Sequence, residues 1–240
     1  MIKYAFLYII CAFIHISHLN AQTITLTTEH YPPYNIDLTL DGGVGVGGAA
    51  TEIVLEMMRR SGYSYNLELM SWKRAYESTL KTKNTGAFST TYTEARKNLF
   101  KWVGPLVDND HVLLAKESST IKIDSIDDVK EYSVGAYRGS SAASYLQSVG
   151  LKPELVRSDH LNPLKLQRGR IDFWMAGHLY GPHLAKQYDV TGLKPVYTVR
   201  KTKMYLAFNI ETADDIINKL NAILRDMEQE GFLAEVYKRY

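Results

Sequence analysis

Apolar and polar residues alternate along the chain in strand-like and helix-like stretches. Residues 23–27 and 65–69 place apolar side chains at every second position, which is typical of β-strands. Between them, residues 51–60 carry apolar side chains three and four apart, and this helical pattern ends at Gly62. A further helix and strand are expected within residues 73–92. This order predicts an α/β protein with mostly parallel sheets.

The same rhythm restarts at Val112, which is our candidate boundary between two structural units. Strands are expected at residues 112–115, 132–137 and 171–176, with helices between them. Near the C-terminus we expect a long amphipathic helix and, after Gly231, a short terminal one. The apolar residues of the long helix share one face: Ile216, Leu220, Ile223, Leu224 and Met227.

The first 21 residues have the pattern of a removable export signal. Lys3 provides a positive start, residues 5–16 are almost wholly apolar, and Ala21 is a small residue suited to cleavage. We therefore expect residues 1–21 to be a signal peptide and the mature protein to reside in the periplasm. No later stretch approaches the ~20 apolar residues that a membrane-spanning helix needs.

Composition excludes several classes of function. Without residues 1–21, 219 of the 240 residues remain, with 27 basic and 26 acidic side chains, so nucleic acid has no basic surface to bind. The single cysteine, Cys11, lies in the signal, which excludes a disulfide scaffold, a cysteine enzyme and a thiolate metal site. Phosphate-loop, nucleophile and metal-ligand spacings are absent. We therefore expect no metal, no cofactor and no nucleic-acid partner.

The most informative local feature is an arginine in an unfavourable position. If Thr93 caps a short helix, Arg96 lies in its first turn, beside the positive end of the helix dipole. A cation there is reasonable if it binds an anion, and guanidinium matches a carboxylate with two donors. Ser89 and Thr91, two apart on the preceding strand, would present hydroxyls on one face. A solvated arginine and ordinary strand-end polar residues remain the alternatives.

A second candidate anion site lies at Ser140 and Ser141, which follow a predicted strand and open a helix after Gly139. Backbone N–H groups and hydroxyls at such a position can bind an anion. The alternative is a simple helix cap, and the binding interpretation gains weight only if this site faces Arg96 across a cleft.

Aromatic and ionisable residues at predicted strand ends complete the candidate set. Tyr31, Tyr34 and Trp72 could form the walls of a ligand pocket, although such rings are often part of a core. Glu29 and His178 end predicted strands, where polar groups commonly meet ligands in α/β sheets. Plain surface exposure is the alternative for both.

Taken together, these residues resemble the periplasmic solute-binding protein family 3, the type found with polar amino-acid importers of the ABC class. The resemblance covers nearly all of the mature chain. Its landmarks keep the family's order and spacing: Tyr31-Pro32-Pro33-Tyr34, Gly47-Gly48 with Glu52 where aspartate is common, Thr93-Glu94-Ala95-Arg96, Gly104-Pro105-Leu106, residues 135–141, Gly169-Arg170-Ile171-Asp172 and Gly231.

The resemblance implies two α/β lobes that close on a ligand and are joined by two crossing strands. Lobe 1 would comprise residues 22–108 and 204–240, and lobe 2 residues 109–203. Arg96 would clamp the carboxylate of a small, amino-acid-like solute, helped by Ser89, Thr91 and Ser141. The protein would be a monomeric, non-catalytic receptor that delivers its ligand to an ABC permease.

One position departs from the family pattern. Amino-acid-binding members usually place an aspartate a few residues beyond the Gly-Arg-Ile-Asp motif, where it takes the ligand's ammonium group. Here the matching residue is Gly177. The acid nearest the family's second ammonium partner is Glu29, one residue out of register. Recognition of an α-amino group is therefore either lost or moved to Glu29.

Two other functions fit the same scaffold. An enzyme resembling the cyclohexadienyl dehydratases would need a general acid beside a bound ring, and Glu29 or His178 could serve. A ligand-sensing partner of a membrane signalling protein is the other alternative.

Overall fold

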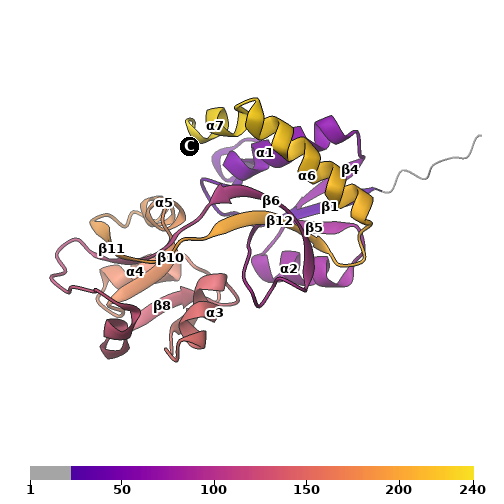
Figure 1. Cartoon of the computed structure of the whole chain (residues 1–240). Coiled ribbons are helices and arrows are strands. Elements are labelled where there is room, and N and C mark those ends of the chain that lie inside the picture. The colour runs from indigo at the N-terminus through magenta and orange to yellow at the C-terminus, as the bar shows by residue number, and fades with distance from the viewer. Residues whose placement is uncertain (1–22) are drawn as a thin grey trace, which may run out of the picture.

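A computed structural model describes residues 23–240 and shows two α/β lobes, one on each side of a pair of crossing segments (Figure 1). The predicted signal peptide lies outside the described residues. No helix of residues 23–240 combines the length and the apolar character needed to cross a membrane.

The first lobe contains a five-stranded sheet in the order β4-β1-β5-β12-β6. Its strands are β1 (Ile24–Thr28), β4 (Tyr65–Leu69), β5 (Thr85–Thr91), β6 (Phe100–Asp108) and β12 (Lys203–Asn209). Its helices are α1 (Ala49–Ser61), α2 (Trp72–Lys81), α6 (Asp214–Gln229) and α7 (Phe232–Tyr237). A small hairpin, β2 (Ile36–Asp37) and β3 (Val46–Gly47), encloses the 3-10 turn η1 (Leu38–Asp41). Helices α1 and α6 lie together on one side of the sheet and α2 on the other (Figure 1).

The second lobe contains a five-stranded sheet in the order β11-β7-β10-β8-β9. Its strands are β7 (His111–Lys116), β8 (Val134–Tyr137), β9 (Glu154–Val156), β10 (Phe173–Gly177) and β11 (Leu193–Arg200). Its helical segments are η2 (Ile126–Glu131), α3 (Ser141–Ser148), α4 (Leu161–Gln167) and α5 (Tyr180–Gln187). The strand β10 is central and buried at every position, which explains its run of apolar residues.

The helix and strand periodicities of the sequence correspond to packed elements. The helix expected at residues 51–60 is α1, and its side chains Ile53, Val54 and Met57 are fully buried against the first sheet. Gly62 ends α1 in the left-handed conformation, with φ at 70°, where a side chain would be strained.

Both sheets are mixed rather than mostly parallel. The pairs β1–β4 and β1–β5 are parallel, but β12 runs antiparallel to both β5 and β6. In the second lobe β7 is likewise antiparallel to β10 and β11. The connection between the lobes explains this arrangement. The chain passes from the first lobe to the second between β6 and β7, and it comes back between β11 and β12. The outgoing and returning strands therefore run in opposite directions and pair antiparallel within each lobe.

Two short crossing segments join the lobes at residues 109–110 and 201–202. They are hydrogen-bonded to each other, since the Asn109 amide donates to the Thr202 carbonyl at 2.8 Å and the Thr202 amide donates to Asp110 Oδ1 at 3.1 Å. The lobes also touch directly: Trp72 Nε1 of lobe 1 donates to the Gly139 carbonyl of lobe 2 at 3.0 Å. The structure therefore shows the lobes in a closed arrangement.

Candidate functional site

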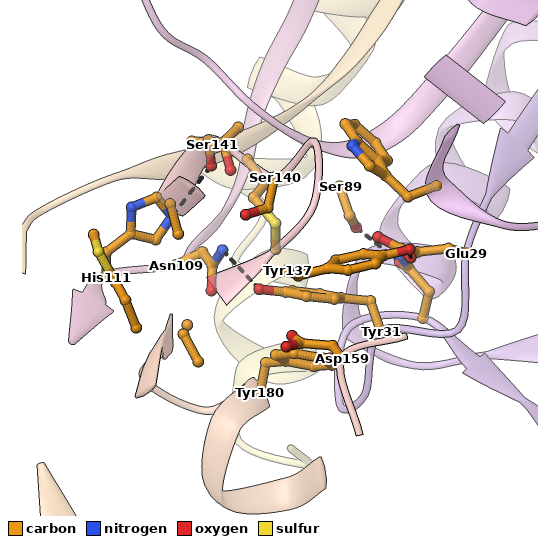
Figure 2. A pocket seen from close by; sticks show the side chains of 18 of the residues that line it. Glu29, Tyr31, Ser89, Asn109, His111, Tyr137, Ser140, Ser141, Asp159 and Tyr180 are labelled. Carbon is orange, nitrogen blue, oxygen red and sulfur yellow. Dashed lines mark hydrogen bonds between the residues drawn. The ribbon is translucent and has the colours of Figure 1, made fainter. Parts of the chain in front are cut away.

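A cavity of about 50 Å³ lies between the lobes. It brings together eight of the ten residues that the sequence singles out, all but Tyr34 and His178: Glu29, Tyr31, Trp72, Ser89, Thr91, Arg96, Ser140 and Ser141. Figure 2 shows how most of these side chains approach one another from different elements. Because the walls belong to both lobes, the cavity exists only while the lobes are closed.

Arg96 is 8% exposed, and its hydrogen-bond partners among the described residues are uncharged carbonyl groups. Its Nη1 donates to the Thr91 carbonyl at 3.3 Å, and its Nη2 donates to the Gly139 carbonyl of lobe 2 at 3.2 Å. The guanidinium carbon lies 5.3 Å from the ring centre of Trp72 and 5.1 Å from that of Tyr76. No carboxylate of residues 23–240 pairs with it, and burial lowers the pKa of its guanidinium.

The expected helix around Arg96 is absent. Residues 94–99 form turns, in which the Arg96 amide donates to the Thr93 carbonyl at 2.9 Å and the Leu99 amide donates to the Arg96 carbonyl at 3.0 Å. The helix prediction, and the dipole argument that depended on it, are therefore wrong. The cation is held by carbonyl oxygens and aromatic faces instead.

Ser89 has a positive φ of 58°, so β5 does not alternate regularly there. Ser89 and Thr91 nevertheless both reach the cavity. The Ser89 hydroxyl donates to Asn35 Oδ1 at 2.8 Å, which fixes the amide of Asn35. Asn35 is fully buried and its Nδ2 has no partner among the described residues, so it offers a donor at the cavity wall.

The sequence left open whether Ser140 and Ser141 form a helix cap or a binding site, and the structure gives the two residues different contacts. Ser140 is the N-cap of α3, since its hydroxyl accepts from the Ala143 amide at 3.1 Å. Ser141 Oγ lies 3.2 Å from Nε2 of His111, a residue of β7 that is 2% exposed. Burial, together with the positive charges of Arg200 and Arg96, lowers the pKa of His111 to about 3. His111 is therefore neutral at physiological pH, and this low pKa makes it a weak base, so hydrogen bonding to Ser141 is the role that the structure shows for it.

Two carboxyl groups line the same cavity, one from each lobe. Glu29 directly follows β1, and Asp159 lies between β9 and α4. Loss of bulk water, with a contribution from the charge of Asp159, raises the pKa of Glu29 to about 8, although Tyr137 Oη donates to Glu29 Oε2 at 3.4 Å. Burial likewise raises the pKa of Asp159 to about 6, against a hydrogen bond from Asn162 Nδ2 at 2.7 Å.

The space where a side chain of residue 177 would lie is filled by neighbouring side chains. A Cβ atom at this position would lie 2.1 Å from Asn109 Oδ1 and 2.9 Å from Tyr31 Oη. Asn109 Nδ2 donates to Tyr31 Oη at 3.3 Å, so the two side chains fill this space together. An acidic side chain at position 177 would therefore require the side chains of Asn109 and Tyr31 to move.

His178 does not line the cavity. It lines a separate recess together with Tyr34 and Tyr237. Its amide donates to the Asp110 carbonyl at 2.8 Å. The last three residues of β10, Met175, Ala176 and Gly177, all line the cavity, whereas His178 belongs to the turn that follows the strand.

The sequence analysis missed several cavity residues, and they come mainly from segments without a motif: Asn35, Asn109, His111, Tyr137, Asp159 and Tyr180. Tyr180 opens α5 and stacks on Tyr31 of the other lobe, with ring centres 3.8 Å apart. Asp159 carried one available signal, since it follows a predicted strand and precedes a helix. Within residues 23–240 no group of three or more His, Cys, Asp or Glu side chains is arranged to hold a metal ion.

Comparison with solved structures identifies the architecture. A histidine kinase sensor domain with similarity to periplasmic binding proteins superposes with a TM-score of 0.81 at 16% identity, covering 91% of this chain and 96% of that one. The arginine-, lysine-, histidine-binding protein ArtJ from Geobacillus stearothermophilus gives 0.78 at 15% identity, covering 91% and 95%. An ancestral arginine-binding protein bound to arginine gives 0.75 at 19% identity, covering 91% and 97%. These likenesses confirm the two-lobe periplasmic-binding-protein fold.

Sequence comparison places the chain in one family. A search of curated proteins found no significant match. In contrast, the family model of bacterial extracellular solute-binding proteins, family 3, matches residues 24–240, which is nearly the whole chain. The family expected from the landmarks is thus confirmed, and this chain belongs to the bacterial extracellular solute-binding proteins, family 3.

Proposed function

We propose that this protein is a periplasmic receptor that captures a small carboxylate-bearing, amino-acid-like solute between its lobes and delivers it to an ABC importer. One observation carries the proposal: Arg96 is a buried guanidinium without a carboxylate partner, and it lines a cavity that both lobes build. A buried cation is costly unless it is paired, so an anionic ligand group is the missing partner.

The donors around Arg96 suit a carboxylate. The Thr91 and Gly139 carbonyls each accept one hydrogen bond from the guanidinium. The residues Thr91, Ser141 and Asn35 add hydroxyl and amide groups to the wall of the same cavity. A charge-assisted hydrogen bond contributes about 1.5 to 3 kcal/mol, enough to anchor a ligand but not to choose among carboxylates.

Closure links binding to delivery. The contact of Arg96 with the Gly139 carbonyl joins the lobes, so a ligand on Arg96 stabilises the closed state that a permease would recognise. At about 50 Å³ the cavity is small in the closed arrangement, so we expect the lobes to separate when a ligand enters. Affinity then depends on the closed population as well as on the contacts. Family membership supports the transport role.

The test compares three variants of the mature protein in a thermal-shift screen against amino acids, their deaminated analogues and aromatic carboxylates. Arg96→Gln should abolish the stabilisation by any carboxylate, and Arg96→Lys should weaken it, because ammonium lacks the two parallel donors. Arg74→Gln, which removes an exposed arginine from α2, is the control and should respond like the wild type. Carboxylate binding that survives in Arg96→Gln would reject the proposal.

An enzyme on this scaffold is a second candidate because Glu29, with its pKa near 8, is protonated at neutral pH and could act as a general acid. Incubation with a carboxylated cyclohexadienyl compound, followed by absorbance of an aromatic product, tests this function. A receptor should show no turnover, whereas turnover that disappears in Glu29→Gln would favour the enzyme.

A further inference from the structure

The recess that contains His178 is built by both lobes and is separate from the cavity that holds Arg96. It measures about 130 Å³, and no residue lines both spaces. Lobe 1 contributes Tyr34, Tyr237 and Tyr240 to it, and lobe 2 contributes His178 and Leu179. We call this space the tyrosine recess. Leu179, Tyr237 and Tyr240 are 42%, 46% and 41% exposed, so a small molecule can reach the recess from solvent.

The three tyrosines present ring surface to the recess rather than free hydroxyl groups. Tyr34 Oη donates to the carbonyl of Asp108 at 2.8 Å. Tyr237 Oη donates to a carbonyl of β6, and Tyr240 Oη donates to a carboxylate of α1 at 2.6 Å. Aromatic faces attract both flat apolar groups and cations. The volume is close to the ~150 Å³ at which an apolar cavity binds benzene, so one aromatic ring fits.

The other polar groups of the wall are hydrogen-bond acceptors. The Asp108 carboxylate has one ion pair, to Lys203 Nζ at 3.5 Å, and Lys203 does not line the recess. His178 Nδ1 is buried and has no hydrogen-bond partner among residues 23–240. In a neutral imidazole with its proton on Nε2, Nδ1 is an acceptor. No lysine or arginine of the described chain lines the recess, so a positively charged donor suits it.

The pKa values of two wall tyrosines agree with a negative potential in the recess. Burial, followed by the charges of Asp108 and Asp110, raises the pKa of Tyr34. Burial, followed by the charges of Asp108 and Glu228, raises the pKa of Tyr237 to about 12. Negative charges that disfavour a phenolate at this place favour a bound cation.

Two turns, residues 31–34 and 177–180, separate the tyrosine recess from the cavity. Tyr31 lines the cavity and Tyr34 the recess, while Tyr180 lines the cavity and His178 the recess. The turns meet where the rings of Tyr31 and Tyr180 stack across the lobes, with centres 3.8 Å apart (Figure 2). A molecule that contacts both lobes in this arrangement stabilises closure.

We propose that the tyrosine recess is a second ligand site, which takes a small cation carrying one aromatic ring while the lobes are closed. The ring of the ligand packs among the tyrosine rings. Its ammonium group donates to the Asp108 carboxylate and to His178 Nδ1. This site is independent of solute capture at Arg96, because a ligand of this class needs no carboxylate.

The experiment is an NMR titration of the mature protein at pH 7 with benzylamine, beside its neutral analogue benzyl alcohol and the anion benzoate. We expect benzylamine to bind best and benzoate worst. Asp108→Asn should reduce the preference for benzylamine over benzyl alcohol about 2- to 5-fold, because the carboxylate is 71% exposed. Glu94→Gln removes an exposed acid that pairs loosely with Lys97 and should leave this preference unchanged.

A variant that fills the recess tests the location of the ligand. Leu179→Trp should weaken benzylamine binding about 10-fold or more. Leu161→Trp is the matched control, because Leu161 is 41% exposed in the same lobe but lines neither space, and it should bind like the wild type. Tyr180→Ala, which removes the stack across the lobes, should bind benzylamine more weakly; equal binding would reject the dependence on closure.

The remaining outcomes separate this site from the solute cavity. Arg96→Gln should keep benzylamine binding, even though it loses the carboxylate solute. Binding that disappears in Glu29→Gln but survives in Leu179→Trp would place benzylamine in the cavity and overturn the proposal. No binding of benzylamine to the wild type, or equal binding of benzoate, would overturn it as well, and neither result bears on the receptor function.

Discussion

Replacing Glu29 by glutamine should make the free protein more stable at alkaline pH. The folded chain holds the pKa of Glu29 at about 8, whereas its ordinary value is 4.5. The folded state therefore binds more protons than the unfolded state between these two values, and the free energy of unfolding falls as pH rises through this range. Glutamine has no proton to lose, so the variant escapes this fall.

The size of the effect follows from the two pKa values. Their difference corresponds to about 5 kcal/mol of stability that the wild type loses between pH 4.5 and pH 8 on account of Glu29. This value is an upper bound, because separation of the lobes moves Glu29 away from Asp159 and readmits water. We expect at least about 2 kcal/mol to remain. The hydrogen bond from Tyr137 can be kept by the glutamine oxygen and adds no pH dependence.

The assay is urea unfolding of wild type and Glu29→Gln in parallel from pH 5 to pH 9. Taking the difference between the two proteins at each pH cancels the titration of every group that does not interact with Glu29. The difference should grow in favour of the variant as pH rises, and Glu94→Gln should give a flat difference. A Glu29→Gln difference that changes by less than about 1 kcal/mol over this range would refute the assigned environment of Glu29.

Two further predictions concern packing at the site. Gly177→Asp should destabilise the closed state by a few kcal/mol, because even its Cβ would overlap Asn109, and the additional change Asn109→Ala should recover most of the loss in thermal melts; an unaffected single variant would contradict the packing argument. Tyr180→Ala removes the ring that stacks on Tyr31 across the cleft and should shift the ligand-free protein toward the open state, seen as a larger radius of gyration in solution scattering, whereas the exposed Tyr188→Ala should not.

Sequence periodicity predicted most helices and strands because their apolar faces are continuous. The helix α1 and the strand β10 could be identified without a structure, since each pattern reflects local burial. The turn at residues 94–99 could not, because carbonyls and rings from distant segments hold Arg96 there and override the local capping signal.

The candidate site was predictable to the extent that strand ends carry it. Glu29 and Ser141 follow that rule. Asp159 lines the same cavity as Glu29, although Glu29 lies 130 positions earlier in the chain, and this proximity is visible only in the folded protein. Likewise, the sequence shows glycine at position 177 but does not show that the side chain of Asn109, from a crossing segment, occupies the space beside it. Such contacts between distant residues depend on how the lobes close, and the closed arrangement cannot be predicted from a local sequence pattern.

The connection between the lobes also carries part of the binding site. Asn109 is hydrogen-bonded to the opposite crossing segment, and His111 begins the next strand, yet both side chains line the cavity. The chain that must bend when the lobes part is thus the chain that meets the solute. A change at either residue would alter ligand preference and the ease of opening together, so capture and release in this protein cannot be adjusted one at a time.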